Sequence, residues 1–298
     1  MPPSTQRRAP PPEEGPLYAA QRHGRRAPRS PAATRKDSCV SHLPEYEQAN
    51  LSMGGRGRLA AGFAKQIELT TEPVRDVPFS RCSVIDIGCG YGHTAAELAK
   101  TCAHVVGLEP NPVLAEQART LSQQDESSRF ELREQPIGQL DEVDAFDVAV
   151  MDNVLEHIED QSEALERLSR CLKPGGVAFI LVPNKVWPIE AHYGLPFLSY
   201  LPLGLANSYL RMSGRGRDYR DASYAPSYIR LKRLLTQRPE LQSRLTVPAD
   251  ISLANGGARA TYRFGVEILR RFPQLWTISK AFLIIAKKRT SVLDGDAA

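Results

Sequence analysis

Between residues 82 and 184, short runs of β-branched and aliphatic residues alternate with stretches of mixed polarity. The runs have the length and composition of buried strands, and they read CSVIDIG, HVVGLEPN, RFELREQ, FDVAVMDN and VAFILVPN. The stretches between them repeat apolar positions at helical spacing, as Ala95, Leu98 and Cys102 do after the first run. Strands separated by helix-length connections predict right-handed crossovers and a parallel sheet.

The helix boundaries in this region carry their own signals. Pro112, a residue favoured in first helical turns, predicts the start of the helix after the second strand. Asp160 and Glu163 have the spacing of an N-cap and an N3 residue in a capping box. Pro174, Gly175 and Gly176 predict the end of that helix before the fifth strand.

The alternation stops at Asn184. Residues 184–225 are rich in aromatic residues, proline and glycine and are too long for an ordinary connection. Because insertions at the C-terminal end of a strand often cover substrates, we predict a lid or substrate insertion here. A helix over 226–237 and a late strand in FLIIAKK then resume the pattern. The fold class predicted is doubly wound α/β, a mostly parallel Rossmann-like sheet with a lid after strand five.

The ends of the chain differ from this α/β domain, which we place at residues 79–290. Residues 1–36 hold eight prolines and eight basic against two acidic residues, which predicts a disordered basic tail. A targeting or anionic-surface role is the alternative for that tail. Residues 37–78 predict a helical segment in two pieces, broken at Gly54 and Gly55, and residues 291–298 a short tail.

Charge and composition exclude several classes of protein. The chain carries +4 and the first 36 residues carry +6, so the remainder is slightly acidic and offers no basic face to nucleic acid. The tail lacks the apolar core of a secretory signal, and five scattered cysteines do not indicate disulfides, so we expect a cytoplasmic protein. No histidine pair has ligand spacing with an acid, so no metal is predicted.

The apolar stretch before the C-terminus bears on membranes. LWTISKAFLIIA, residues 275–286, is too short for a membrane span and contains Lys280. Its basic flanks also suit an interfacial helix, but a buried strand is the interpretation favoured here. Peripheral membrane association is therefore left open, as is the oligomeric state.

The stretch VIDIGCGYGH indicates a nucleotide-like ligand. Gly88, Gly90 and Gly92 follow the first strand, where glycine lets the backbone turn sharply and approach a ligand. A P-loop is excluded because GK[ST] is absent, and a dinucleotide site would have its third glycine where His93 stands. Glu109 ends the second strand, where an acid can accept hydrogen bonds from both hydroxyls of a ribose.

The segments VIDIGCGYGHTAAELA, VVGLEPN, FDVAVMDNVLEHIED and LKPGGVAFILVPN together resemble the successive motifs of class I S-adenosylmethionine-dependent methyltransferases that act on small molecules. The resemblance spans residues 84–184 and implies S-adenosyl-L-methionine as the cofactor. Carried over residue by residue, it implies a cofactor site made of Asp86, Gly88, Cys89, Gly90, Glu109, Pro110, Asp152 and Asn153.

One departure concerns the adenine. The family usually has an acid just after strand three that contacts the adenine amino group. Here that position reads REQPIG, and Glu134 and Gln135 are imperfect candidates. The resemblance therefore leaves the adenine contacts unassigned.

The insertion offers catalytic candidates. VPNKVWPIEAHYGLPFLSYLP resembles a segment of methyltransferases that act on sugars, polysaccharides or lipid-linked substrates. It places His192 and Glu190, with Tyr193, near the methyl group. A histidine of near-neutral pKa can take the proton of a substrate hydroxyl, and a purely structural loop residue is the alternative. For His157 we favour a packing or capping role over a catalytic one.

Methyl transfer from a sulfonium is an in-line displacement, so holding the reactants in line and excluding water can provide most of the acceleration. The sequence predicts methyl transfer to a small-molecule acceptor, with an oxygen of a hydroxylated, glycosyl or lipid-linked compound preferred. The alternatives are an NAD-dependent oxidoreductase and a non-catalytic partner subunit that keeps the fold.

Overall fold

The computed structural model describes residues 56–254, 257 and 259–290. The two predicted tails and the first piece of the predicted N-terminal helical segment lie outside the described residues. The second piece is confirmed as helix α2, Arg56–Thr71.

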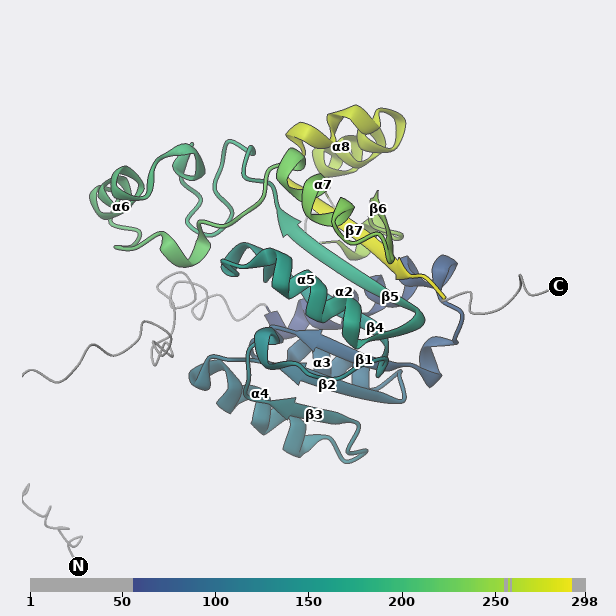
Figure 1. The fold of residues 1–298 in the computed structure, drawn as a ribbon. Helices are drawn as coiled ribbons and strands as arrows, with labels where there is room; N and C mark the ends of the chain where they lie inside the picture. Colours follow the sequence, from purple (N-terminus) through teal and green to yellow (C-terminus); the bar gives the residue numbers. More distant parts are fainter. Residues whose placement is uncertain (1–55, 255–256, 258, 291–298) are drawn as a thin grey trace, which may run out of the picture. The chain divides into compact units, whose positions relative to one another are not determined.

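A seven-stranded sheet in the order β3-β2-β1-β4-β5-β7-β6 is the centre of the described region. The first five strands are parallel, and β7 and β6 add antiparallel pairs at one edge. The strands are β1 Ser83–Ile87, β2 His104–Leu108, β3 Phe130–Arg133, β4 Phe146–Asp152, β5 Leu172–Pro183, β6 Leu241–Thr246 and β7 Ala281–Lys288. The mostly parallel Rossmann-like sheet is confirmed (Figure 1).

The remaining helices connect these strands or follow them. They are α3 His93–Ala99, α4 Pro112–Gln124, α5 Gln161–Cys171, α6 Leu203–Met212, α7 Tyr228–Thr236 and α8 Ala260–Arg271. Two of the predicted starts are visible as caps. The Asn111 side chain accepts hydrogen bonds from the amides of Val113 and Leu114 in front of α4, and Asp160 accepts one from the Glu163 amide in front of α5.

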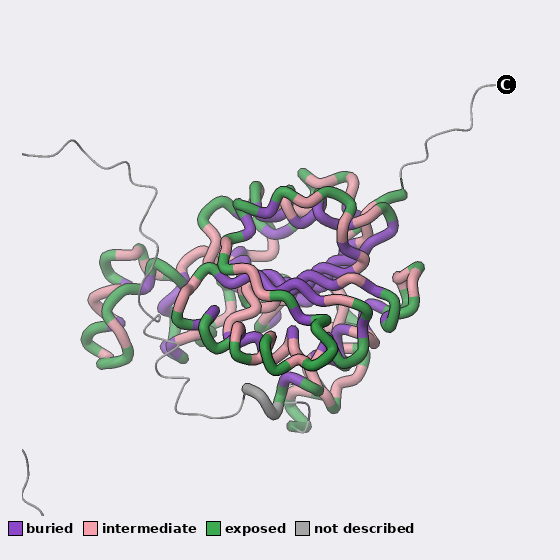
Figure 2. The backbone as a smooth tube through the Cα atoms, turned by 90° about the horizontal axis from the view of Figure 1, so that it is seen from below, coloured by how far each residue is buried: buried purple, intermediate pink, exposed green. Residues whose placement is uncertain are grey.

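Successive side chains of a strand point to opposite faces, and the sheet therefore has two apolar cores. One core packs Ala64 and Ile67 of α2 with Leu98 of α3, and the other packs Leu165 and Leu168 of α5. The inner strands β1, β2, β4, β5 and β7 are buried along most of their length (Figure 2). Both faces being covered explains why the strands read as continuous apolar runs.

Two sequence predictions need correction. Pro174, Gly175 and Gly176 do not end α5; the helix ends at Cys171, and these residues lie in β5. Leu172 already pairs with Phe146, and a register shift follows before the regular pairing of Val148 with Val177. The sequence also did not predict β6, whose pairing with β7 is long-range.

The segment predicted as an insertion, residues 184–225, leads from β5 to α7 and contains α6. Figure 1 shows it beyond the tip of the β5 arrow. It has a hydrophobic cluster of its own, and the members of that cluster are Tyr193, Leu195, Leu198, Ala206, Leu210, Tyr219 and Ala222. The segment is therefore packed around its own small core.

The late apolar stretch forms a strand. Residues Phe282–Ala286 lie in β7 and are buried, as the interpretation favoured from the sequence requires. In the described part of the chain, no helix combines the length and the apolar character that a membrane crossing needs.

Candidate active site

The three glycines after β1 differ in how closely other atoms pack around them. Gly88 and Gly92 have positive φ values of 70° and 77° and are tightly packed. A Cβ on Gly88 would lie 2.5 Å from Cγ2 of Val154, and one on Gly92 would lie 2.9 Å from the Ala118 Cβ. Gly90, with φ 57°, faces open space, because a Cβ there would meet no described atom within 4 Å. Gly90 is thus the glycine of this loop that leaves room for a ligand to approach the backbone.

Glu109 directly follows β2 and holds the glycine loop in place. Its Oε2 accepts the Gly90 amide at 2.9 Å, and its Oε1 accepts the Asn111 amide at 2.8 Å. The side chain is 5% exposed. Each carboxylate oxygen has two lone pairs, so each can accept a further hydrogen bond from a ligand hydroxyl. The position of Glu109 beside Gly90 fits the predicted ribose contact.

Backbone amides of this loop already form hydrogen bonds within the protein. Cys89 donates its amide to the Leu108 carbonyl, and its thiol packs against Gly107 of β2. The side chain of Cys89 therefore faces the sheet. Any contact of this residue with a ligand would use its carbonyl and not its thiol.

Asp86, the only carboxylate inside β1, is nearly fully buried, and its Oδ2 has no hydrogen-bond partner among the described residues. Burial, followed by the negative charges of Asp152 and Glu109, raises the pKa of Asp86 to about 8. An unsatisfied buried carboxylate costs free energy, which a cationic ligand group would recover. The arrangement of these three acids favours a positively charged ligand at this edge of the sheet.

The end of β4 provides two more of the predicted residues. Asp152 closes the strand, and Asn153 follows in the left-handed region with φ 53°. The Asn153 side-chain amide donates to Asp152 Oδ1 at 2.9 Å, and its backbone amide donates to the Leu181 carbonyl. Both residues lie where the parallel strands end, beside the glycine loop, because β4 pairs with β1.

The remaining cofactor candidates lie on the surface or outside the described side chains. Pro110 is exposed next to Glu109. Glu134 forms a 2.7 Å ion pair with Arg119 at the surface, and Gln135 is half-buried. From the sequence, Arg56 after the glycine pair could reach a ligand carboxylate or be a solvated arginine at a helix break; its side chain lies outside the described side chains.

Glu190 and His192, the predicted catalytic pair, are in direct contact. The Nδ1 of His192 lies 2.9 Å from Glu190 Oε1, and Glu190 Oε2 accepts the backbone amides of His192 and Tyr193. Glu190 is buried, so its carboxylate orients the turn and the imidazole. Tyr193, by contrast, lies in the small core of the insertion and donates its hydroxyl to the Asp218 carbonyl.

A residue that sequence reasoning did not select lies opposite His192. Glu156, in the 3-10 turn after β4, is 0% exposed, and its Oε1 lies 3.7 Å from His192 Nε2. Burial, followed by the charges of Asp152 and Glu190, raises the pKa of Glu156 to about 8. The signal that could have identified it is its place between Leu155 and His157, directly after a strand that ends in an acid.

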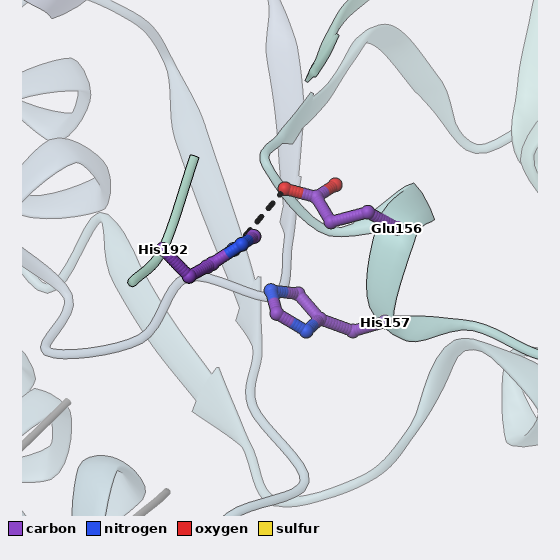
Figure 3. Close-up of side chains that lie close together, drawn as sticks. All are labelled: Glu156, His157 and His192. Atoms are coloured by element: carbon purple, nitrogen blue, oxygen red, sulfur yellow. Dashed lines mark ion pairs between the residues drawn. The ribbon is translucent and has the colours of Figure 1, made fainter. Parts of the chain in front are cut away.

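His157 joins the same group. Its Nδ1 lies 2.5 Å from the Asp221 carbonyl, and its ring packs edge-on against His192 with centroids 4.9 Å apart. Burial, followed by the charge of the neighbouring His192, lowers the pKa of His157 to about 4. The packing role favoured for His157 agrees with these contacts, and the ring also lies beside the catalytic candidates (Figure 3).

Comparison with known proteins followed this geometry. The family model described as a methyltransferase domain matches residues 54–225, which is more than half of the chain. The matched region contains the glycine loop, Glu109, the end of β4 and the insertion.

Two curated relatives are each 28% identical to this chain and bear the name ubiquinone biosynthesis O-methyltransferase. The protein of Bartonella tribocorum aligns over 144 residues, 46% of this chain and 57% of the relative. That of Acinetobacter baylyi aligns over 149 residues, 47% of this chain and 61% of the relative. The chain thus spans little more than half the length of these relatives.

Among solved structures, the plantazolicin methyltransferase BpumL in complex with SAH (S-adenosylhomocysteine) superposes with a TM-score of 0.53. The match covers 82% of this chain and 89% of that one at 14% sequence identity. At this identity the likeness concerns the fold.

Proposed function

Because this chain belongs to the class I S-adenosylmethionine-dependent methyltransferases, we propose that it transfers the donor's methyl group to an oxygen of a hydroxylated small molecule. Membership of this family removes the NAD-dependent oxidoreductase from consideration. The name shared by the two relatives supports an oxygen as the acceptor atom. Glycosyl and lipid-linked compounds are the acceptor classes that the insertion favours.

The observation that carries the proposal is the contact between Glu109 and Gly90. A buried carboxylate that accepts the Gly90 amide lies beside the loop glycine that faces open space. This pair suits a nucleoside, because the carboxylate can accept both ribose hydroxyls while the glycine lets the sugar approach the backbone. The residues present therefore fit S-adenosylmethionine.

Asp86 extends this fit to the charged part of the cofactor. Its unpartnered oxygen is buried beside Asp152 and Glu109. The methionine part of S-adenosylmethionine carries an ammonium, and its sulfur is a sulfonium. A cationic group here would offset the mutual repulsion of the three acids, so we assign Asp86, Asp152 and Asn153 to the methionine side of the site.

The acceptor side contains His192 and Glu190. S-adenosylmethionine supplies a methyl group that is already activated for displacement. The chain's task is then to place the acceptor oxygen in line and to exclude water. Because Glu190 contacts Nδ1, the Nε2 atom of His192 is the one directed to the acceptor side of the proposed site.

Two measurements test the proposal. Titration of the purified chain with S-adenosylhomocysteine in a calorimeter should give micromolar affinity, whereas NADH should not bind. Methyl transfer from labelled S-adenosylmethionine to a panel of phenols, sugars and lipid-linked hydroxyl compounds should then give turnover with at least one class. Binding without turnover on every acceptor would favour the non-catalytic subunit.

The variant His192→Ala separates the two halves of the site. It should keep S-adenosylhomocysteine affinity within about threefold and lower methyl transfer by about 10²-fold or more. His104→Ala is the matched control, because His104 also pairs with a glutamate, Glu131, at 3.6 Å but on the surface at β2 and β3. Equal activity of the two variants would remove His192 from the acceptor site.

A further inference from the structure

Three side chains that could bind a cation converge between the end of β4 and the insertion. They are Glu156, His157 and His192, and one ligand atom of each lies within 4.8 Å of the others. Figure 3 shows the Glu156 carboxylate and the two imidazole rings facing a common point. Two of these side chains come from the turn after β4 and the third from the insertion.

Contacts on the far side of each ring orient both histidines. The Nδ1 of His157 must donate to the Asp221 carbonyl, which can only accept. The Nδ1 of His192 lies against the Glu190 carboxylate, which itself receives two backbone amides. Protons on both Nδ1 atoms leave the Nε2 lone pairs turned toward Glu156. A carboxylate or carbonyl behind an imidazole is the support that metal-ligating histidines usually have.

Glu156 provides the independent observation. Its side chain is fully buried, and neither carboxylate oxygen has a hydrogen-bond partner among the described residues. Buried carboxylates are normally paired, hydrogen-bonded or bound to a metal. The distance of 3.7 Å to His192 Nε2 is longer than a hydrogen bond. The carboxylate of Glu156 is thus buried without a hydrogen-bond partner among the described residues, at the point where the two imidazoles converge.

We propose that Glu156, His157 and His192 bind a divalent cation of the zinc class, with Glu190 and the Asp221 carbonyl as positioning groups. In a tetrahedral site with bonds of about 2.0–2.1 Å, the ligand atoms are roughly 3.3 Å apart. The separation of Glu156 and His192 is already close to that value. Two imidazoles and a carboxylate favour Zn²⁺ or Co²⁺ over Mg²⁺ and Ca²⁺, which prefer oxygen ligands.

Three protein ligands leave a coordination position for the acceptor, which is how catalytic zinc sites are built. The acceptor is then a molecule whose hydroxyl oxygen can coordinate the cation. That hydroxyl loses its proton to water, and its oxygen bonds to the methyl carbon as the carbon–sulfur bond breaks. The charges of the oxyanion and the sulfonium cancel. This part rests on the proposed methyl transfer, whereas the cation site itself does not.

The test is a titration of chelator-treated full-length chain with Co²⁺ alone, followed by visible absorption. We expect one equivalent to bind with the intense bands of four-coordinate Co²⁺, and Zn²⁺ to displace it. His192→Ala should lower Co²⁺ affinity by more than 100-fold, and His104→Ala should leave it unchanged. Glu190→Gln, which keeps the side-chain size but weakens the support of the imidazole and of its turn, should lower it about 10- to 100-fold.

Glu156→Gln guards against loss of folding, because it keeps the side-chain volume and removes the ionisable carboxyl group. It should melt at or above the temperature of the parent chain and still lose Co²⁺ binding. Failure of Co²⁺ and Zn²⁺ to bind at micromolar concentration, or equal binding by the His192 and His104 variants, overturns the site. S-adenosylhomocysteine titration of the same metal-free samples reports on the proposed function separately, since its ligand contacts lie at Gly90 and Glu109.

Discussion

Glu109 and Glu156 are buried glutamates that follow β2 and β4, the two strands on either side of β1, yet their surroundings are opposite. Both oxygens of Glu109 accept backbone amides, one from Gly90 in the loop after β1 and one from Asn111. Neither oxygen of Glu156 has a hydrogen-bond partner among the described residues. The cofactor half of the proposed site is therefore held together by backbone hydrogen bonds, whereas the proposed acceptor half contains a buried carboxylate without such partners among the described residues.

This difference indicates how ligand binding should affect each half of the proposed site. Backbone hydrogen bonds hold the glycine loop of the cofactor half in place without a ligand. Among the described residues of that half, Asp86 has a buried oxygen without a hydrogen-bond partner. The acceptor half is formed from the turn after β4 and from the insertion, which has a core of its own. Binding at the acceptor half should therefore join two separately packed parts, and binding at the cofactor half should not.

The largest expected effect comes from a substitution in the cofactor half. Glu109→Ala removes the acceptor for the Gly90 amide and, on our proposal, for two ribose hydroxyls. Hydrogen bonds to charged groups contribute about 1.5–3 kcal/mol each, so S-adenosylhomocysteine affinity should fall by about 10²-fold or more. Calorimetric titration measures this change.

Glu166→Ala is the matched control, because that glutamate lies on α5, outside the proposed cofactor site, and pairs with Arg238 at the surface. Surface ion pairs contribute little, so its affinity should stay within about threefold of the parent. Unchanged affinity in the Glu109 variant would show that the nucleoside lies elsewhere.

The next effect concerns the buried charge of Asp86. With its pKa raised from 3.8 to about 8, the folded chain keeps this carboxyl protonated at pH values where the unfolded chain has lost the proton. Folding then takes up a proton, and the free energy of unfolding decreases as the pH rises from about 4 to about 8. Asp86→Asn cannot ionise, so its stability should depend less on pH across this window.

At pH 8 the asparagine variant should be more stable than the parent, and the gain should shrink toward pH 4. Urea denaturation at several pH values measures both curves. The same variant should bind S-adenosylhomocysteine more weakly, because it cannot pair with a cation. Parallel pH curves for the two chains would contradict the assignment.

A smaller effect separates the two kinds of loop glycine. Gly88→Ala places a methyl group against Val154 in a left-handed backbone and should cost about 3 kcal/mol of unfolding free energy. Gly90→Ala should cost only about 1 kcal/mol, because its methyl group enters open space. Gly90→Ala should instead weaken cofactor binding more than it weakens the fold. Chemical denaturation and calorimetry on both variants give the comparison.

The features that the sequence could predict differ from those it could not in how far apart the contacting residues lie in the chain. The parallel strands, the caps at Asn111 and Asp160 and the glycine loop depend on residues close in the chain, and their patterns are local. The end of α5 was placed too late because the pairing of Leu172 with Phe146, a long-range contact, outweighs the helix-ending signal of Pro174. β6 was missed for a similar reason, since only its pairing with β7 makes it a strand.

The acceptor half could not be predicted from local sequence patterns. His157 and His192 lie on segments far apart in the sequence, so no ligand spacing between them is visible, and the sequence analysis expected no metal. Glu190 and His192 were found because the pattern after β5 pointed to them. Glu156 passed unnoticed because a lone glutamate in a turn is usually solvent-exposed, and only the insertion above it brings about its burial.

The smallest expected effect concerns the outer surface of the acceptor half. The insertion exposes Phe197, Tyr200, Leu205 and Met212, and Phe197 is held in the left-handed region at φ 55° with its ring against Tyr200. Exposed apolar side chains near arginines suit the interface of an anionic membrane, so peripheral membrane association stays a prediction. The cofactor half has no comparable group among the described residues that we would expect to bind lipid.

Co-sedimentation with vesicles of anionic and neutral phospholipid measures this binding. Replacing Phe197 and Leu205 by serine should lower the bound fraction on anionic vesicles several-fold, because each exposed apolar side chain inserted into lipid contributes on the order of 1 kcal/mol. Val143→Ser, at an exposed valine just before β4 and remote from the insertion, should leave it unchanged. If the parent chain stays in the supernatant with both lipids, the apolar surface serves a water-borne acceptor, and the contrast between the two halves is confined to their interiors.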